Sequence, residues 1–263
     1  MAENKQWTDA ELEKMDGWAW SNLLRAQPQL ADRCDWTKLN SFDWSWLLAE
    51  QPQFADRCPW KEFDGWAWSY LLQKQPQFAD GCPWEKLAGS DWSCLLADQP
   101  QFADRCPWSE WKRPGEGDEL RCFNWGVLLK AQPQFEAKCP WDDLRSSDWA
   151  NLLAECPGYA DRCPWSEFNG TDWADLLASQ PQFAASCPWE KVSGEDWLTI
   201  MTFQPQFADR CPWDSFSNHD WCMLLSDQPQ FADRCPWEKL TSMDWFLLLR
   251  RQPQLAAYRP EGI

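Results

Sequence analysis

Residues 43–60, DWSWLLAEQPQFADRCPW, contain the unit from which this chain is built. Its QPQFADRCPW core returns with few changes, and 24 residues separate Pro52 from Pro76 and Pro76 from Pro100. The spacing changes once, where 33 residues separate Pro100 from Pro133, nine more than the period. A fixed period of about 20 to 50 residues is typical of a solenoid, in which each repeat buries its apolar side against its neighbours. We therefore expect a stack of about ten repeats.

The first piece of each repeat is predicted to be an α-helix over about 43–51. Trp44, Leu47 and Leu48 follow one another at i, i+3 and i+4, which places them on one face of a helix. Asp43 is the acid expected at its N-terminal turn. This face is the predicted core of the repeat.

Prolines divide the rest of the repeat into two shorter pieces. Pro52 lacks an N–H, so it ends the first helix and suits the first turn of a second piece over 52–58. Pro59 opens a third piece with Trp60 and Phe63, which is short enough to be a 3₁₀ turn. A Gly or Ser is then expected to close the repeat, as at Ser41, Gly65 and Gly89.

Polar residues recur in the second piece as well. Gln51 and Gln53 have counterparts along the chain, and their amides are expected to satisfy backbone groups that the prolines leave free. Asp56 and Arg57 also recur, and we interpret them as an exposed or inter-repeat row of ion pairs that each contribute little to stability. No catalytic role is expected for Asp56 and Arg57.

The composition excludes several classes of protein. The net charge of −17 disfavours a nucleic-acid partner, because phosphates need a basic surface. No apolar run approaches 18 residues, so no membrane span is expected. The beginning of the sequence has no apolar signal-peptide stretch, which favours a cytoplasmic location.

Nine of the 13 cysteines occupy one position of the repeat. Stacked helical repeats are about 8–10 Å apart, whereas a disulfide needs Cα atoms about 4.4–6.8 Å apart. Neighbouring cysteines are therefore expected to be free, buried thiols in a reducing compartment. These cysteines are Cys34, Cys58, Cys82, Cys106, Cys139, Cys163, Cys187, Cys211 and Cys235. No short-spaced Cys or His cluster predicts a metal site.

The repeats divide the chain into five parts. An N-terminal cap is expected over 1–15, where Thr8 and Glu11 have the spacing of a capping box. Repeats are expected over 16–108 and 123–256, on either side of a loop insertion over 109–122 that is rich in charge, Pro and Gly. Residues 257–263 are the predicted C-terminal cap and tail. Insertions in repeat arrays sometimes contribute to the binding face.

Three positions of the first helix differ most between repeats. They lie two residues before the helix Trp, two after it and six after it, which places them on one stripe of the helix away from the Leu-Leu face. We call them the variable stripe. Its members predicted to contact a partner are Trp18, Asn22, Phe42, Trp46, Glu50, Trp66, Tyr70, Lys74, Cys94, Asp98, Val127, Asn151, Asp175, Thr199, Phe203, Met223 and Leu247.

The variable stripe has three interpretations. A solvated face that drifts freely should be filled with Lys, Glu, Ser and Asn, whereas this one also has large apolar side chains, which mark interaction sites on protein surfaces. The first interpretation is therefore a diversified binding surface. The second is a stripe partly buried between helices or used for self-association, and the third is neutral drift.

Two resemblances accompany this interpretation. The QPQFADRCPW unit with its DW-x-x-LL helix resembles tandem Trp-rich repeat proteins predicted in bacteria. The 24-residue period, with one helix followed by short turns, is similar to the variant leucine-rich repeat family over roughly residues 16–256. That resemblance implies a right-handed α-solenoid of α- and 3₁₀-helices. The Trp and Cys positions depart from that family's motif, and its iron–sulfur cluster is not expected here.

We expect an all-α solenoid that binds a protein or an extended peptide through the variable stripe. No nucleophile–base pair, phosphate loop or metal cluster is recognisable, so we expect no enzymatic activity and no cofactor. We expect a monomer, with no nucleic-acid or membrane partner. The alternatives are a structural or self-assembling solenoid and, less favoured by charge, a nucleic-acid reader.

Overall fold

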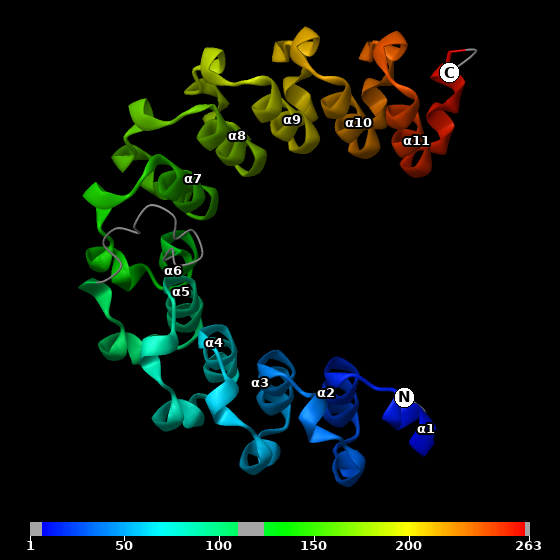
Figure 1. The fold of residues 1–263 in the computed structure, drawn as a ribbon. Helices are drawn as coiled ribbons and strands as arrows, with labels where there is room; N and C mark the ends of the chain where they lie inside the picture. The colour runs from blue at the N-terminus through cyan, green and yellow to red at the C-terminus, as the bar shows by residue number, and fades with distance from the viewer. Residues whose placement is uncertain (1–6, 110–123, 261–263) are drawn as a thin grey trace. The chain divides into compact units, whose positions relative to one another are not determined.

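The computed structural model describes residues 7–109 and 124–260, and these residues form α-helices and 3₁₀-helices with no β-strand. A regular alternation of one α-helix with short 3₁₀-helices follows the 24-residue period of the sequence (Figure 1). The fold is therefore the predicted all-α solenoid. The α-helices are α1 (Asp9–Glu13), α2 (Gly17–Ala26), α3 (Ser41–Glu50), α4 (Gly65–Lys74), α5 (Gly89–Asp98), α6 (Trp125–Ala131), α7 (Ser146–Glu155), α8 (Gly170–Ser179), α9 (Gly194–Phe203), α10 (Asn218–Asp227) and α11 (Ser242–Arg251).

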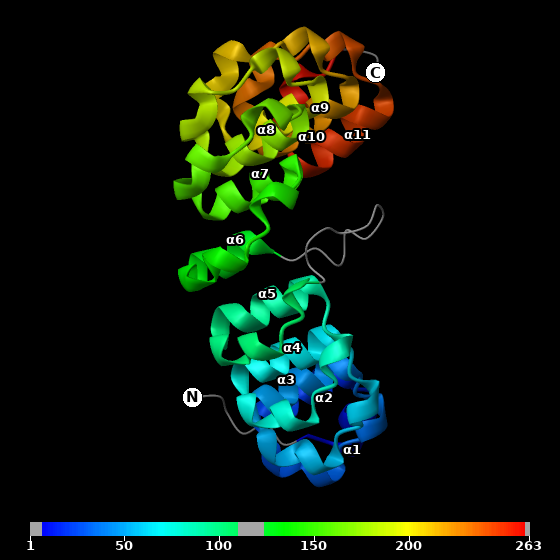
Figure 2. The same ribbon diagram turned by 90° about the vertical axis from the view of Figure 1, so that its left-hand side faces the viewer.

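The chain forms two compact units, Met1–Asp143 and Leu144–Ile263. In the first unit α2 to α6 stack in chain order, and in the second unit α7 to α11 do the same. Within each unit the α-helices form one layer and the 3₁₀-helices form the other, as the ribbons in Figures 1 and 2 show. Most of the predicted insertion, residues 110–122, lies outside the described residues.

The α-helices begin earlier than predicted. Helix α3 begins at Ser41, and Asp43 is its third residue rather than its first. Asn40 is the N-cap, because its Oδ1 accepts from Asp43 N–H at 3.0 Å while Asp43 Oδ2 accepts from Asn40 N–H at 3.1 Å. The expectation that Ser41, Gly65 and Gly89 close a repeat was wrong, since each is the first residue of an α-helix.

The two proline-led pieces are both 3₁₀-helices. In the second repeat they are η3 (Pro52–Arg57) and η4 (Trp60–Glu62), and Pro52 occupies the first turn as expected. The others are η1 (Pro28–Arg33), η2 (Trp36–Lys38), η5 (Pro76–Gly81), η6 (Trp84–Lys86), η7 (Pro100–Arg105), η10 (Pro133–Lys138), η11 (Trp141–Asp143), η12 (Pro157–Arg162), η13 (Trp165–Glu167), η14 (Pro181–Ala185), η15 (Trp189–Lys191), η16 (Pro205–Arg210), η17 (Trp213–Ser215), η18 (Pro229–Arg234), η19 (Trp237–Lys239) and η20 (Pro253–Tyr258).

The core lies between the two layers and is built from the predicted apolar face. Trp44, Leu47 and Leu48 of α3 are at most 1% exposed. The Trp that begins η2, Trp36, stacks on Trp44 with ring centroids 5.1 Å apart. The same stacking joins a 3₁₀-helix Trp to a helix Trp in later repeats, for example Trp60–Trp68, Trp165–Trp173, Trp189–Trp197 and Trp237–Trp245. The last 3₁₀-helix of each repeat is therefore joined to the α-helix of the next repeat through a pair of indoles.

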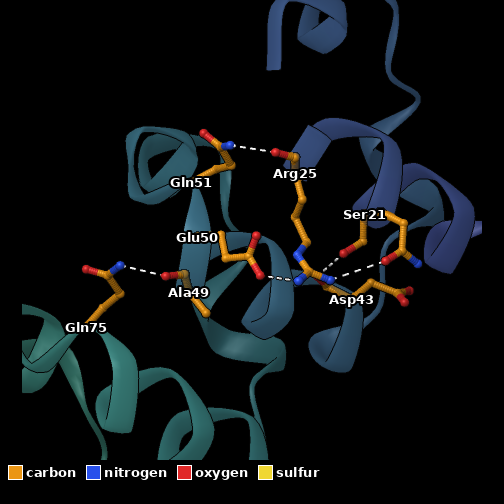
Figure 3. Close-up of polar contacts among 8 residues, drawn as sticks. Ser21, Arg25, Asp43, Ala49, Glu50, Gln51 and Gln75 are labelled. Carbon is orange, nitrogen blue, oxygen red and sulfur yellow. Dashed lines mark hydrogen bonds and ion pairs between the residues drawn. The ribbon is translucent and has the colours of Figure 1, made fainter. Parts of the chain in front are cut away.

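Hydrogen bonds tie each repeat to the one before it. Gln51 Nε2 donates to the Arg25 carbonyl at 2.8 Å, and Gln75 Nε2 donates to the Ala49 carbonyl at 2.6 Å (Figure 3). The second glutamine stays within its repeat, since Gln53 Nε2 donates to Gln51 Oε1. The predicted role of these amides is confirmed, with the first glutamine as the inter-repeat link. The same link is made by Gln99, Gln132, Gln180, Gln204, Gln228 and Gln252.

The cysteines of the repeat are free thiols, and all of them are buried except the partly exposed Cys34. Burial raises the pKa of Cys58 and of Cys82 to about 12. Both observations agree with the prediction of buried, unbridged cysteines. The structure therefore gives these thiols the role of small apolar side chains.

The caps continue the register of the repeats. Helix α1 has the predicted capping box of Thr8 and Glu11. Lys38 Nζ donates to the carbonyls of Glu13 and Met15, just as Lys86 Nζ, two repeats later, donates to those of Lys61 and Phe63. Residues 1–6 and 261–263 of the predicted caps lie outside the described residues. Among the residues that the structure describes, no helix has the length and apolar character to cross a membrane.

Candidate binding surface

The variable stripe lies at the surface of the α-helical layer. Trp18, Phe42 and Trp66 are 46, 39 and 43% exposed, although each is a large apolar side chain. Trp46 and Tyr70 are half-buried by their neighbours. None of the predicted stripe residues is fully buried, and several are partly buried between helices, as the second interpretation of the stripe expects. The half-buried members share the packing of neighbouring helices.

Five aromatic side chains of the first unit form one continuous patch across α2, α3 and α4. Trp46 stacks on Tyr70 with ring centroids 5.2 Å apart, and Phe42 stacks on Trp66 at 5.0 Å. Trp18 meets both Phe42 and Trp46 with centroids 5.7 Å apart. Trp66 and Tyr70, one turn apart on α4, stack at 5.5 Å. We call these five residues the aromatic patch.

One edge of the aromatic patch is held by charged and polar side chains. The Arg25 guanidinium lies 5.1 Å from the Trp46 ring centroid and forms an ion pair with Glu50 (Figure 3). Its Nη1 also donates to Asn22 Oδ1 at 3.2 Å, and Asn22 Nδ2 donates to the Trp18 carbonyl. These contacts restrain the Trp46 ring and surround an apolar patch with polar groups, as at many recognition surfaces.

The patch is also partly dehydrated. Burial raises the pKa of Tyr70, the nearby Glu50 charge adds to this rise, and Arg25 opposes it.

Further along the stack, Lys74 of α4 pairs with Asp98 of α5 at 3.6 Å. Cys94, on the same stripe, is exposed, and Val127 of α6 is half-buried. The stripe therefore passes from aromatic to polar side chains within the first unit.

The stripe of the second unit begins with small polar and acidic groups. Asn151 and Asp175 are exposed, while Thr199 is half-buried. Burial raises the pKa of Asp175, and the charges of Asp172 and Asp196 raise it further. This part of the stripe is therefore polar and acidic, in contrast with the aromatic patch.

Apolar side chains return at the end of the second unit. Phe203 is 64% exposed, and Met223 and Leu247 are 39 and 49% exposed. A hollow of about 500 Å³ lies between α10 and α11, and it is lined by His219, Cys222, Met223, Ser226, Leu247, Arg250 and Arg251. This hollow combines aliphatic side chains with two arginines, so it differs chemically from the aromatic patch.

Comparison with protein-family models, curated proteins and solved structures found no match for this chain. The described residues contain no group of three or more His, Cys, Asp or Glu side chains arranged to hold a metal ion. The feature that distinguishes this surface is the exposed aromatic patch.

Two residues at this surface were missed in the prediction. Arg25 is next to a variable position but outside the stripe, and only its contacts with Trp46 and Glu50 reveal its part in the patch. Phe246 follows the helix Trp of α11, where most other repeats have Ser, Ala or Gly, and it is 64% exposed. The unusual size of Phe246 was the signal available in the sequence.

Proposed function

We propose that this chain is a non-enzymatic binding protein that recognises a protein or an extended peptide through the variable stripe. The observation that supports this most strongly is the aromatic patch, in which large rings remain partly exposed on three successive helices. Clustered apolar side chains on a surface mark interaction sites. Aromatic residues surrounded by polar groups also predominate among the side chains that carry most of the binding energy.

The side chains of the stripe indicate which class of partner fits it. Stacked rings offer wide apolar faces, and the aromatic patch is bounded by the Arg25–Glu50 and Lys74–Asp98 pairs. A segment with aliphatic or aromatic side chains fits the aromatic patch, with polar groups beside these two ion pairs. The net charge of −17 disfavours a polyanion as the general partner.

A selection from a displayed peptide library tests this function. The stripe variant combines Phe42→Ser, Trp46→Asn, Trp66→Ser and Tyr70→Asn, because the chain itself has Ser90 and Asn151 at these repeat positions. The natural chain is expected to enrich peptides with aromatic or aliphatic side chains, and the stripe variant is expected to lose them. Circular dichroism and the urea midpoint of each variant show whether the fold is kept.

A matched control separates the stripe from the rest of the surface. Lys61→Ser, Glu62→Ser and Glu85→Ser change exposed residues of the 3₁₀-helical layer, and this control is expected to enrich the same peptides as the natural chain. Enrichment by the stripe variant within twofold of the natural chain would remove the support for the proposal.

A second candidate function is self-association, and the exposed apolar side chains of α11 favour it. Met243 and Phe246 are 65 and 64% exposed there. Sedimentation velocity over a hundredfold range of concentration tests this candidate. Association that Phe246→Ser abolishes would support it, whereas a monomer at every concentration would exclude it.

A further inference from the structure

The repeated arginine of the 3₁₀-helical layer has a constant position. The Arg57 guanidinium carbon lies 5.1 Å from the ring centroid of Trp36 in the preceding repeat, and Arg57 Nη2 lies 3.6 Å from Asp32 Oδ1. An indole face and a carboxylate therefore hold the guanidinium between them. The cation over the indole returns with Arg105 over Trp84, Lys138 over Trp108, Arg210 over Trp189 and Arg234 over Trp213.

The C-terminal repeat fills this position with a different side chain. Tyr258 replaces the arginine, and its ring stacks on Trp237 with centroids 4.8 Å apart. Its hydroxyl donates to Asp233 Oδ1 at 3.0 Å. A residue that lacks the arginine charge thus still uses both the indole face and the carboxylate, which shows that the two form one site.

Two repeats have no long side chain at this position, where the residues are Gly81 and Ser186, and a pocket is found at the first of them. The residue that corresponds to Arg57, one repeat later, is Gly81, and the indole that it would cover is Trp60. A pocket of about 440 Å³ lies at this place. Its lining residues are Ala55, Asp56, Trp60, Trp68, Gln77, Phe78 and Gly81.

The residues of the pocket are those that hold arginine elsewhere. Trp60 stacks one face on the buried Trp68 at 5.1 Å and meets Phe78 at 5.4 Å, so its orientation is set. Asp56 corresponds to Asp32, and it has no ion-pair partner among the described residues. Gln77 uses its Nε2 on Gln75 Oε1, which leaves an amide oxygen as an acceptor.

We propose that this pocket binds the arginine side chain of a peptide or protein partner, whose guanidinium takes the place that Arg57 takes over Trp36. The planar guanidinium stacks on Trp60 and pairs with Asp56. The net charge of −17 favours the approach of a cationic segment. Apart from Trp68 of α4, the residues that line the pocket belong to the 3₁₀-helical layer, and none belongs to the variable stripe, so the pocket can be tested separately from the proposed function.

The volume of the pocket favours a peptide over a free cation. Pockets of about 300–1,000 Å³ typically hold molecules much larger than one guanidinium group. The space left beside the guanidinium suits the backbone on either side of an arginine, with Gln77 as a hydrogen-bond partner for an N–H. An arginine within a peptide is therefore expected to bind more tightly than methylguanidinium.

The test follows the indole N–H signals of the full chain labelled with ¹⁵N-tryptophan, with Trp60 assigned through Trp60→Phe. The probes are acetyl-Gly-Arg-Gly-amide and the same peptide with neutral citrulline, which keeps the shape of arginine without its charge. The arginine peptide is expected to shift the Trp60 signal saturably, with a Kd at least about fivefold lower than that of the citrulline peptide. Equal effects of the two peptides would overturn the proposal.

Two substitutions test the site in opposite directions, since one fills it at Trp60 and the other opens the equivalent site at Trp84. Gly81→Arg is expected to abolish the Trp60 response, and the chain has room for it because a Cβ on Gly81 would meet only Trp68 Cη2, at 3.6 Å. Arg105→Gly is expected to create a new response at Trp84, which has Asp80 in the position of Asp56. A Trp60 response that survives Gly81→Arg would refute the site. Binding of methylguanidinium chloride as tight as that of the arginine peptide would refute the peptide as its partner.

Discussion

Gln51 Nε2 donates a hydrogen bond of 2.8 Å to the carbonyl oxygen of Arg25, at the end of the preceding helix. The proline that follows Gln51 ends its own helix, and the free amide then reaches back across the boundary between repeats. The scaffold thus ends each helix at the proline and joins it to the preceding helix through the side chain of the glutamine. This hydrogen bond adds to the apolar contacts between successive repeats.

Replacing Gln51 tests this link. Gln51→Ala is expected to lower the free energy of unfolding by about 1–2 kcal/mol, because the partly buried Arg25 carbonyl loses its partner. The matched control is Gln53→Ala, which removes an exposed bond to Gln51 and is expected to cost less than about 0.5 kcal/mol. Urea denaturation followed by tryptophan fluorescence measures both, and equal losses would show that the inter-repeat bond is not the important one.

Two tryptophans on α3, one in the core and one at the surface, are expected to contribute differently to stability. Trp44 is 1% exposed, so Trp44→Ala is expected to cost about 3–5 kcal/mol through loss of burial and a cavity. Trp46 is half-buried in the aromatic patch, and Trp46→Ala is expected to cost about 1–2 kcal/mol through lost ring contacts. Thermal and urea unfolding of the two variants compare them. A loss for Trp46→Ala as large as that for Trp44→Ala would make Trp46 a structural residue.

The first residue of α4 tests how closely successive repeats approach. A Cβ on Gly65 would lie 2.3 Å from the Lys86 carbonyl oxygen and 2.5 Å from Asp91 Oδ2. Gly65→Ala is therefore expected to destabilise the chain by about 1–3 kcal/mol. Gly158→Ala is the control, because nothing lies within 4 Å of the added Cβ, and its effect is expected to be within about 0.5 kcal/mol or slightly stabilising. Urea midpoints of the two variants that agreed with each other would contradict this close packing.

The buried thiols predict a loss of stability at alkaline pH. Burial raises the pKa of Cys58 and of Cys235 from an ordinary value of 9.0 to about 12. Between these values the unfolded chain releases thiol protons that the folded chain retains, so the free energy of unfolding falls as the pH rises. Each such thiol contributes a slope of up to about 1.4 kcal/mol per pH unit.

Urea denaturation at pH 8, 9.5 and 10.5 measures this slope. Cys58→Ala removes one of the titrating thiols, so its stability is expected to fall less steeply than that of the natural chain. The difference between the two slopes isolates the thiol from other groups that titrate in this range. Identical slopes would mean that Cys58 ionises equally well in the folded and unfolded chains.

Much of the scaffold could be predicted from local pattern. The spacing of Trp44, Leu47 and Leu48 predicted the buried face of α3, and the prolines predicted where it ends. The start of the helix was misplaced by two residues, because the predicted helix began at Asp43, whereas Asp43 is the third residue of α3 and an acid of its first turn. The reciprocal bonds between Asn40 and Asp43 show that the acid of a capping box lies inside the first turn.

The candidate site was predicted only as a set of positions. The differences between repeats identified Trp18, Phe42, Trp46, Trp66 and Tyr70 as unusual, but they did not show that the five rings form one patch. Arg25 was missed because its repeat position, although it varies, has no large apolar side chain in any repeat. The pocket over Trp60 was also missed, because its signal is the loss of a constant residue at Gly81 rather than a difference within the variable stripe.

The amino-acid sequence alone specifies the period, the apolar face, the helix ends and the buried thiols, because each depends on residues only a few positions apart. The partners of Gln51, Arg57 and Gly81 lie 21 to 26 residues away in the preceding repeat. Such partners depend on how one repeat packs against the next. That packing is set by apolar contacts and hydrogen bonds across the whole interface between repeats. For this reason the aromatic patch and the open face of Trp60 became visible only in the folded chain.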